Sequence, residues 1–208
     1  MAAFETVRHQ VAIAGQVTDA RTGRAIGGAC VQITIAPQAF RDFLALRALP
    51  YGERWETLVE RPDRTRTAAD GHFHFLDLPD GAYTCTATLP GAGSRYGTVQ
   101  AGATVLRDAA GNLPMATVNL ALPPTSLKGQ IADQDTADPV FMAEVRVQGS
   151  GEHAFSNAQG DYLLTGLETG VRTVQVAAQG YQAASQAVTL GQAGTEQTVH
   201  FSLVSSTL

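Results

Sequence analysis

Apolar and polar residues alternate along several short stretches of the chain. Val17, Val31 and Ile33 in one part of the sequence, and Phe73 and Phe75 further on, have polar or small residues between them. A period of two places successive side chains on opposite faces of a β-strand, so these stretches are expected to be strands with one face on a core and one in water. The pattern predicts an all-β protein made of small two-sheet sandwiches.

One stretch departs from this period and indicates helix. Between Pro37 and Pro50 the apolar residues fall into two groups on nearly opposite sides of a helix, with Phe40, Phe43 and Leu44 in one group and Leu46 and Leu49 in the other. A second short helix is expected at about 53–60, with Trp55, Leu58 and Val59 on one side. The first helix therefore has more apolar surface than one packing face can cover.

The two halves of the chain repeat one another. Residues 13–33 align with residues 127–147 without a gap, and the matching positions include Gly15 with Gly129 and Asp19 with Asp133. Each half then has a glycine turn before a strand and ends in a short alternating strand, at 118–122 and 199–203. The repeat predicts two domains, 1–124 and 125–208, with a stiff joint at Pro123 and Pro124.

The repeated residues resemble a known family. From Gly15 the first half reads G-x-V-x-D-x-x-T-G-x-x-I-x-G-A-x-V, and from Asp70 it reads D-G-x-F-x-F-x-x-L-P-x-G-x-Y. This pattern resembles the carboxypeptidase regulatory-like domain, a transthyretin-like or prealbumin-like sandwich. The second half departs from the pattern at Gln159, Glu168 and Arg172. The resemblance implies two tandem transthyretin-like (Ig-like) β-sandwiches that serve as accessory, binding or spacer modules, and it implies no particular ligand.

The repeat also isolates an insertion in the first half. Gly71 follows Gly15 by 56 residues, whereas Gly160 follows Gly129 by 31, and the extra residues fall at about 36–64. This segment is interpreted either as a flap that packs on the first sandwich or as a docking element for another protein, and an active-site lid is a third reading. The candidate protein-interaction residues are Phe40, Phe43, Leu46, Leu49, Trp55 and Leu58.

Composition and charge limit the classes of partner that the chain can bind. The 208 residues are 44% hydrophobic with a net charge of -5, so there is no basic surplus for nucleic acid or an anionic membrane. The chain has no run of about 18 apolar residues, and its first ten residues lack the apolar core of a signal peptide. We therefore expect neither nucleic-acid nor membrane binding, and a cytoplasmic location.

Histidines and aspartates that could hold a metal have simpler interpretations. His72 and His74 share the outward face of one predicted strand, and no third ligand is indicated by the spacing. Asp133, Asp135 and Asp138 resemble a calcium loop only in part, because the glycine and terminal glutamate of an EF-hand are missing. These residues are expected to be solvated or turn-forming, and no metal or cofactor is predicted.

The cysteines are predicted to be free thiols. By strand alternation Cys30 faces away from the side of Val31, whereas Cys85 follows Tyr83 into the core, which gives the wrong geometry for a bridge. Neither cysteine has a nearby histidine in sequence that would indicate an activated nucleophile.

These observations predict a non-catalytic structural or adaptor protein that engages other protein subunits through residues 36–64. By analogy alone, such a sandwich without an export signal fits an accessory subunit (a cap, adaptor or decoration) of a phage-tail-like contractile particle, including one released from the cell. One alternative is a carbohydrate-binding or cell-surface adhesion module that uses Tyr96, Phe155 or Tyr181. A second is a cryptic hydrolase whose pocket joins His72 or His74 to Asp77, Arg95 or Cys85.

Overall fold

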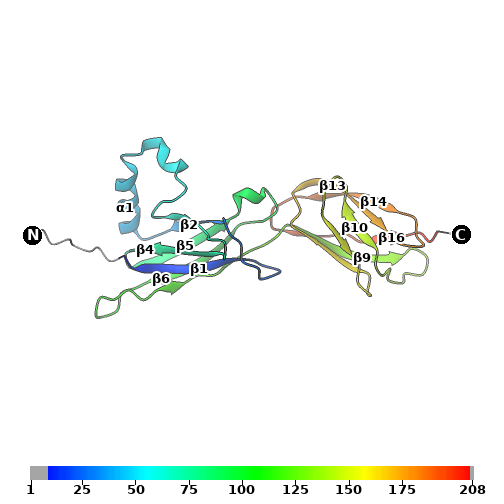
Figure 1. The fold of residues 1–208 in the computed structure, drawn as a ribbon, viewed down its shortest axis with the longest axis horizontal. Coiled ribbons are helices and arrows are strands. Elements are labelled where there is room, and N and C mark those ends of the chain that lie inside the picture. The colour runs from blue at the N-terminus through cyan, green and yellow to red at the C-terminus, as the bar shows by residue number, and fades with distance from the viewer. Residues whose placement is uncertain (1–8, 207–208) are drawn as a thin grey trace, which may run out of the picture. The chain divides into compact units, whose positions relative to one another are not determined.

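The computed structural model describes residues 9–206. Contacts divide the chain into two compact units (Figure 1). The first comprises the chain up to Gly91 together with Thr98–Leu122, and the second comprises Ala92–Gly97 together with the chain from Pro123 onward.

The first unit is a sandwich of two four-stranded sheets. In one sheet β1 (Val11–Asp19) pairs antiparallel with β4 (His72–Leu76) and parallel with β7 (Ala116–Thr117) and β8 (Leu120–Leu122). The other has the order β3 (Arg64–Arg66), β2 (Cys30–Ile35), β5 (Gly81–Thr88) and β6 (Val99–Val105).

The second unit repeats this arrangement strand for strand. Here β9 (Ser126–Asp133) pairs antiparallel with β12 (Asp161–Thr165) and parallel with β15 (Glu196–Thr198) and β16 (Phe201–Leu203). Its other sheet has the order β11 (His153–Phe155), β10 (Glu144–Val147), β13 (Gly170–Ala177) and β14 (Ala184–Leu190). The prediction of two tandem β-sandwiches is confirmed.

The core follows the alternation of the sequence. Val17 and Val31 are fully buried, and Phe73 and Phe75 are almost so. The second unit has an equivalent core, which includes Leu127, Ile131, Val145, Tyr162 and Phe201. Period-two patterning therefore identified the buried face of each sheet correctly.

The glycine that opens each repeat is required by a close backbone approach. A Cβ on Gly15 would lie 1.6 Å from the carbonyl oxygen of Val118, and a Cβ on Gly129 would lie 1.6 Å from that of Val199. At both places the last strand is interrupted, and a side chain substitutes for the missing ladder bond. The Gln16 amide donates to Asn119 Oδ1, and the Gln130 amide donates to His200 Nδ1, each at 3.1 Å.

A loop from the first half of the sequence belongs to the second unit. It follows a 3₁₀ turn, η2 (Pro90–Ala92). Thr125 Oγ1 donates to the Ser94 carbonyl at 2.7 Å, and Ser94 Oγ accepts from the Thr169 amide at 2.9 Å. Arg95 forms an ion pair with Glu152 and donates to the Gly166 carbonyl at 2.6 Å. The division of the chain thus differs at 92–97 from a single boundary near Pro124.

The insertion contains one α-helix and one 3₁₀ helix. Helix α1 spans Gln38–Ala48, as predicted, whereas the second helix, η1, is a 3₁₀ helix over Gly52–Thr57. The prediction of a helix reaching residue 60 was wrong, since Leu58 is already extended. The Arg64 side chain donates hydrogen bonds to the carbonyls of Glu56 and Leu58, which an α-helix would use for its next turn.

Candidate docking surface on the insertion

The first turn of α1 fastens the insertion to the sandwich. Phe40 is 2% exposed and lies edge-on to Tyr83, with 5.9 Å between ring centroids. Pro37 lies against the backbone of Gly81, because a Cβ there would come within 2.2 Å of the proline ring. This end of the insertion is part of the core.

The opposite side of α1 is in solvent. Leu46 is 67% exposed and Leu49 is 74% exposed, while Phe43 at the border between the two sides is 41% exposed. Tyr51 and Val59, which follow in the insertion, are about half exposed. The predicted conflict between two apolar faces is therefore resolved in this chain by leaving one face uncovered.

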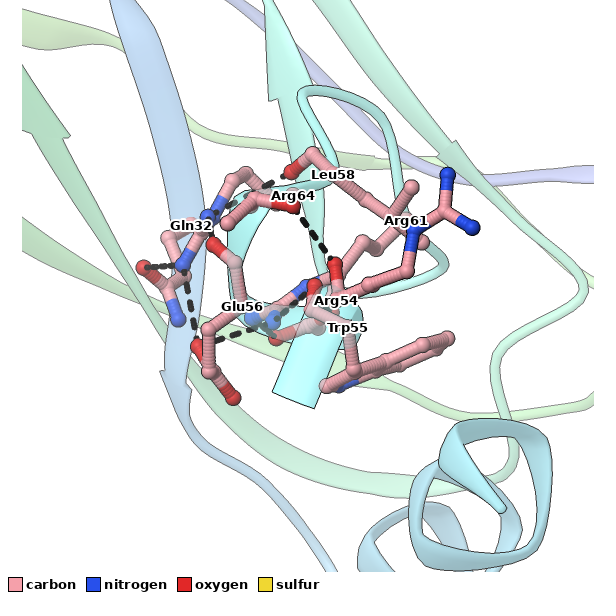
Figure 2. A network of polar contacts seen from close by, with 9 residues as sticks. Gln32, Arg54, Trp55, Glu56, Leu58, Arg61 and Arg64 are labelled. Carbon is pink, nitrogen blue, oxygen red and sulfur yellow. Dashed lines mark hydrogen bonds and ion pairs between the residues drawn. The ribbon is translucent and has the colours of Figure 1, made fainter. Parts of the chain in front are cut away.

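A buried arginine holds the rest of the insertion in place. The Arg61 side chain is 3% exposed and makes two hydrogen bonds to Asp63, at 3.0 and 2.8 Å. It also contacts Glu56 at 3.0 Å and lies 5.1 Å from the centre of the Trp55 ring (Figure 2). Because Asp63 also accepts a hydrogen bond from the Ile33 amide through its carbonyl, this pair connects the insertion to β2.

A second arginine connects the same turn to the sheet. Arg64 on β3 donates to the carbonyls of Glu56 and Leu58, at 3.1 and 3.4 Å, and to Gln32 Oε1 at 3.3 Å (Figure 2). Its Nε atom is buried without a hydrogen-bond partner in the described part of the chain. The two arginines give the 3₁₀ segment a defined position although none of its residues is buried.

Two hollows lie at the insertion, the larger between it and the strands and the smaller within it. The larger, of about 390 Å³, is lined by Phe40, Phe43 and Arg47 of α1, by residues 60–62, by Arg64 and Thr65, and by His9 and residues 74–77. The smaller, of about 150 Å³, is lined by Arg47, Tyr51, Trp55, Leu58 and residues 60–62. They share Arg47 and residues 60–62, and the two hollows together are here called the insertion groove.

The predicted interaction residues take different places on this surface. Phe40 is in the core, Leu46 and Leu49 face solvent, and Phe43, Trp55 and Leu58 line the groove. Sequence reasoning missed Arg61, Asp63 and Arg64, which hold the surface in shape. The signal that could have found them is the close spacing of opposite charges directly before β3.

The residues proposed for a hydrolase do not form a catalytic set. Burial raises the pKa of the Cys85 thiol to about 11, so this thiol is not activated as a nucleophile. His74 and Asp77 both line the insertion groove, but Asp77 is bonded to His9 and to the Gln10 amide. Arg95 belongs to the second unit, and Thr65 provides the only aliphatic hydroxyl among the described residues that line the groove.

The aspartates of the calcium-like loop are engaged in turn formation. Asp133 Oδ1 accepts from the amides of Asp135 and Thr136, at 2.8 and 3.0 Å, and Asp133 Oδ2 accepts from Ser205. The Thr136 amide, followed by Ser205, lowers the pKa of Asp133 to about 2. Asp19 makes the same two amide contacts in the first unit. Within residues 9–206 no group of three or more histidine, cysteine or acidic side chains could hold a metal ion.

The three candidate aromatics for a glycan are separate. Tyr181 interacts with Asp133, Tyr96 forms an isolated β-bridge with Pro124, and Phe155 is 51% exposed beside His153. A hollow of about 230 Å³ on β10, β13 and β14 is lined by small and polar residues and contains no aromatic side chain.

Both cysteines are free thiols, as predicted. Cys85 is buried and Cys30 is half-buried.

No helix in residues 9–206 is both long and apolar enough to cross a bilayer.

No curated protein matches the sequence. Similar solved structures include the minor pilin GBS52 of Streptococcus agalactiae, at 15% identity and a TM-score of 0.33, covering 94% of this chain and 96% of that one. The shaft pilin SpaA of Lactobacillus rhamnosus GG shows 13% identity and a TM-score of 0.42 over 98% of this chain and 99% of that one.

A further similar structure is the TIE protein of Bacillus anthracis, at 14% identity and a TM-score of 0.36, where this chain covers 34% of that one. Similarity at this level does not indicate a shared function. The sequence profiles are more specific: the carboxypeptidase regulatory-like domain matches residues 12–113, and the CarboxypepD_reg-like domain matches residues 127–208. The chain therefore belongs to the carboxypeptidase regulatory-like family, with two of its domains in tandem.

Proposed function

We propose that this chain is a non-catalytic structural or adaptor protein that binds another protein through the insertion at 36–64. The observation that carries the proposal is the two-sided helix α1. Phe40 on one side is 2% exposed, whereas Leu46 and Leu49 on the other are 67% and 74% exposed. Exposed apolar side chains gathered on one element are typical of a protein interface.

The insertion also has the stability that a docking element needs. Arg61 and Arg64 bond its backbone and acidic side chains, so its apolar groups are presented in a fixed arrangement. A fixed surface loses less conformational freedom on binding than a flexible one. Trp55, the only tryptophan of the chain, lies next to the exposed groups and suits the role of an interface anchor.

Two finer hypotheses belong to the same proposal. The partner is another subunit of an assembly, for which a phage-tail-like contractile particle is our specific hypothesis, and the site of assembly is the cytoplasm. They rest on analogy with other small β modules that cap or decorate such particles. Isolation of the native assembly with a tagged chain, followed by identification of its subunits, tests both.

Point substitutions test the proposal better than removal of the insertion. Deleting residues 37–63 would remove Phe40 and Asp63, which serve the fold. The double substitution Leu46→Glu with Leu49→Glu changes solvent-exposed positions only. Val171→Glu is the matched control, because Val171 is 70% exposed on the second unit.

The expected result is that the unmodified chain and the Val171→Glu variant elute from source cells in a larger complex, while the double variant elutes as a free chain with an unchanged melting temperature. Retention of the larger complex by the folded double variant would contradict the proposal.

A further inference from the structure

The insertion groove runs along an unpaired strand edge. β4 is the end strand of its sheet, and the bond from the Val17 amide to the Gly71 carbonyl fixes which residues of β4 bond to β1. By alternation, the amides and carbonyls of His74 and Leu76 point away from β1. No hydrogen bond to these backbone groups is present within residues 9–206. Such an edge is a template for an added strand.

The groove offers side-chain sites beside this edge. Phe43 of α1 lines it from the insertion side, and Phe75 and Leu76 line it from the strand side. The adjoining smaller hollow is lined by Trp55 and Leu58. A strand added to β4 would present alternate side chains to this apolar lining, which is how strand addition obtains specificity.

The charges on the groove indicate the chemistry of the occupant. Arg47 and Glu60 line both hollows, and neither forms an ion pair with a residue in the described part of the chain. The Arg47 guanidinium lies over the ring of Phe43, 5.5 Å from its centre. In contrast, Arg61 is already paired with Asp63. An occupant with one acidic and one basic side chain would complement the two unpaired charges.

We propose that the groove binds an extended segment of a partner protein, which adds to β4 as a further strand. Its backbone bonds His74 and Leu76, its carboxylate faces Arg47, its basic side chain faces Glu60, and an apolar side chain enters the hollow at Trp55 and Leu58. This inference rests on the proposed function and specifies how the partner is recognised.

The second unit provides a natural control. Leu163 on β12 occupies the position of His74, and its amide also points away from the neighbouring strand. No insertion covers that edge, because β10 and β11 are joined by a short turn at 148–152. The same backbone change can therefore be made with and without the groove.

The test uses the full chain and a blocked nine-residue peptide in which valine alternates with polar residues, one of them glutamate and one lysine. Binding is measured from Trp55 fluorescence, and amide hydrogen exchange reports on His74 and Leu76. We expect saturable binding that slows exchange at both amides. His74→Pro removes an outward amide without breaking the β1 ladder and should weaken binding about tenfold, whereas Leu163→Pro should not change it.

Two further arms keep the result interpretable if His74→Pro unfolds the domain. A peptide N-methylated at alternate amides on its bonding edge should bind at least about tenfold more weakly. Arg47→Glu should weaken binding of the original peptide to a similar extent. A peptide in which lysine replaces the glutamate should bind the Arg47→Glu variant better than it binds the unmodified chain.

Three outcomes would overturn the inference. Fluorescence changes without slowed exchange at His74 and Leu76 would show binding without strand addition, and the proposed docking role of the insertion would survive. Failure of every peptide form to bind, while the Leu46 and Leu49 double variant still loses its native complex, would also separate the two proposals. Concentration-dependent self-association abolished by His74→Pro would assign the groove to a second copy of this chain.

Discussion

Arg61 is the residue on which the position of the insertion depends most. Its side chain is 3% exposed and its main partner, the Asp63 carboxylate, is 7% exposed, so neither charge can be rehydrated without moving the chain. Arg61→Met keeps much of the side-chain volume but removes the charge and all the donated hydrogen bonds. The substitution therefore leaves a buried carboxylate without its pair.

The expected loss of stability in Arg61→Met is set mainly by the broken ion pair with Asp63. Breaking a buried ion pair by removing one partner costs about 3–5 kcal/mol. The lost contact with the Trp55 ring contributes on the order of 1 kcal/mol, which overlaps with the first quantity because both groups are held by one side chain. Glu56 is 72% exposed and adds little. We expect the free energy of unfolding of the first unit to fall by about 3 kcal/mol.

The measurement is urea unfolding followed in parallel by circular dichroism and by tryptophan fluorescence. Trp55 is the only tryptophan, so its emission reports on the insertion alone. Release of the 3₁₀ segment should shift the emission to longer wavelength before the sheets unfold. Arg54→Met, in the same turn but exposed, is the control and should change stability by less than about 0.5 kcal/mol.

A double-mutant cycle measures the interaction energy between Arg61 and Asp63. Asp63→Asn alone leaves the Arg61 cation with only Glu56, whereas the double variant Arg61→Met with Asp63→Asn leaves no buried charge. The double variant should be more stable than the sum of the single changes predicts, by at least about 1 kcal/mol. If Arg61→Met unfolds within about 0.5 kcal/mol of the unmodified chain, the buried-pair reasoning is wrong.

Three further predictions concern the backbone and one carboxylate. Met142 has a φ of 58°, where the first unit has Gly28 at 75°, so Met142→Gly should raise the free energy of unfolding by about 0.5–1 kcal/mol and Gly28→Ala should lower it by about 1 kcal/mol. Gly129→Ala should cost about 3 kcal/mol or prevent folding of the second unit, because its Cβ would overlap the Val199 carbonyl, while Gly151→Ala, with open space around it, should be nearly neutral; urea unfolding measures all four. The pKa of Asp133 is lowered to about 2, so its charged form stabilises the fold above the ordinary aspartate pKa and this contribution is lost as the pH falls through 2. The melting temperature of the unmodified chain should therefore exceed that of Asp133→Asn at pH 5 and approach it near pH 2, and a constant difference across that range would contradict this assignment.

The sequence predicted the sheets well because their pattern is local. Alternation of apolar residues identifies a buried strand face, and Phe73 and Phe75 behave as it requires. The repeat then supplied what one domain alone could not, namely the equivalence of Gly15 with Gly129. Their shared physical reason, a carbonyl oxygen 1.6 Å from where a Cβ would be, became visible only in the structure.

Features that depend on distant contacts were not predictable in the same way. The loop at 92–97 carries no periodic signal, and its place in the second unit depends on hydrogen bonds that join Ser94 and Arg95 to residues more than 30 positions away. Similarly, the early end of η1 depends on Arg64, which lies outside the predicted helix. Helical periodicity describes how the side chains of a segment are arranged. It does not show which backbone carbonyls will accept hydrogen bonds from a distant side chain such as Arg64.

For the candidate site, the sequence identified the segment but not the role of each residue. Helical spacing placed Phe40 and Leu46 on different sides, and the structure agrees. However, spacing cannot say which side packs on the sandwich. Phe40 was therefore included among the interaction residues although it is 2% exposed and belongs to the core.

The comparison of the two units bears directly on why the insertion exists. The second unit builds the same two sheets in the same strand order without it, so the fold does not require these residues. The buried parts of the insertion are Phe40 and the Arg61–Asp63 pair. They explain how the insertion is fastened, through contacts that the second unit does not have. They do not explain Leu46 and Leu49, which are mostly in solvent and carry the unfavourable hydration of exposed apolar surface. This combination, a segment fastened on one side and apolar in solvent on the other, is why we propose that a partner protein covers it.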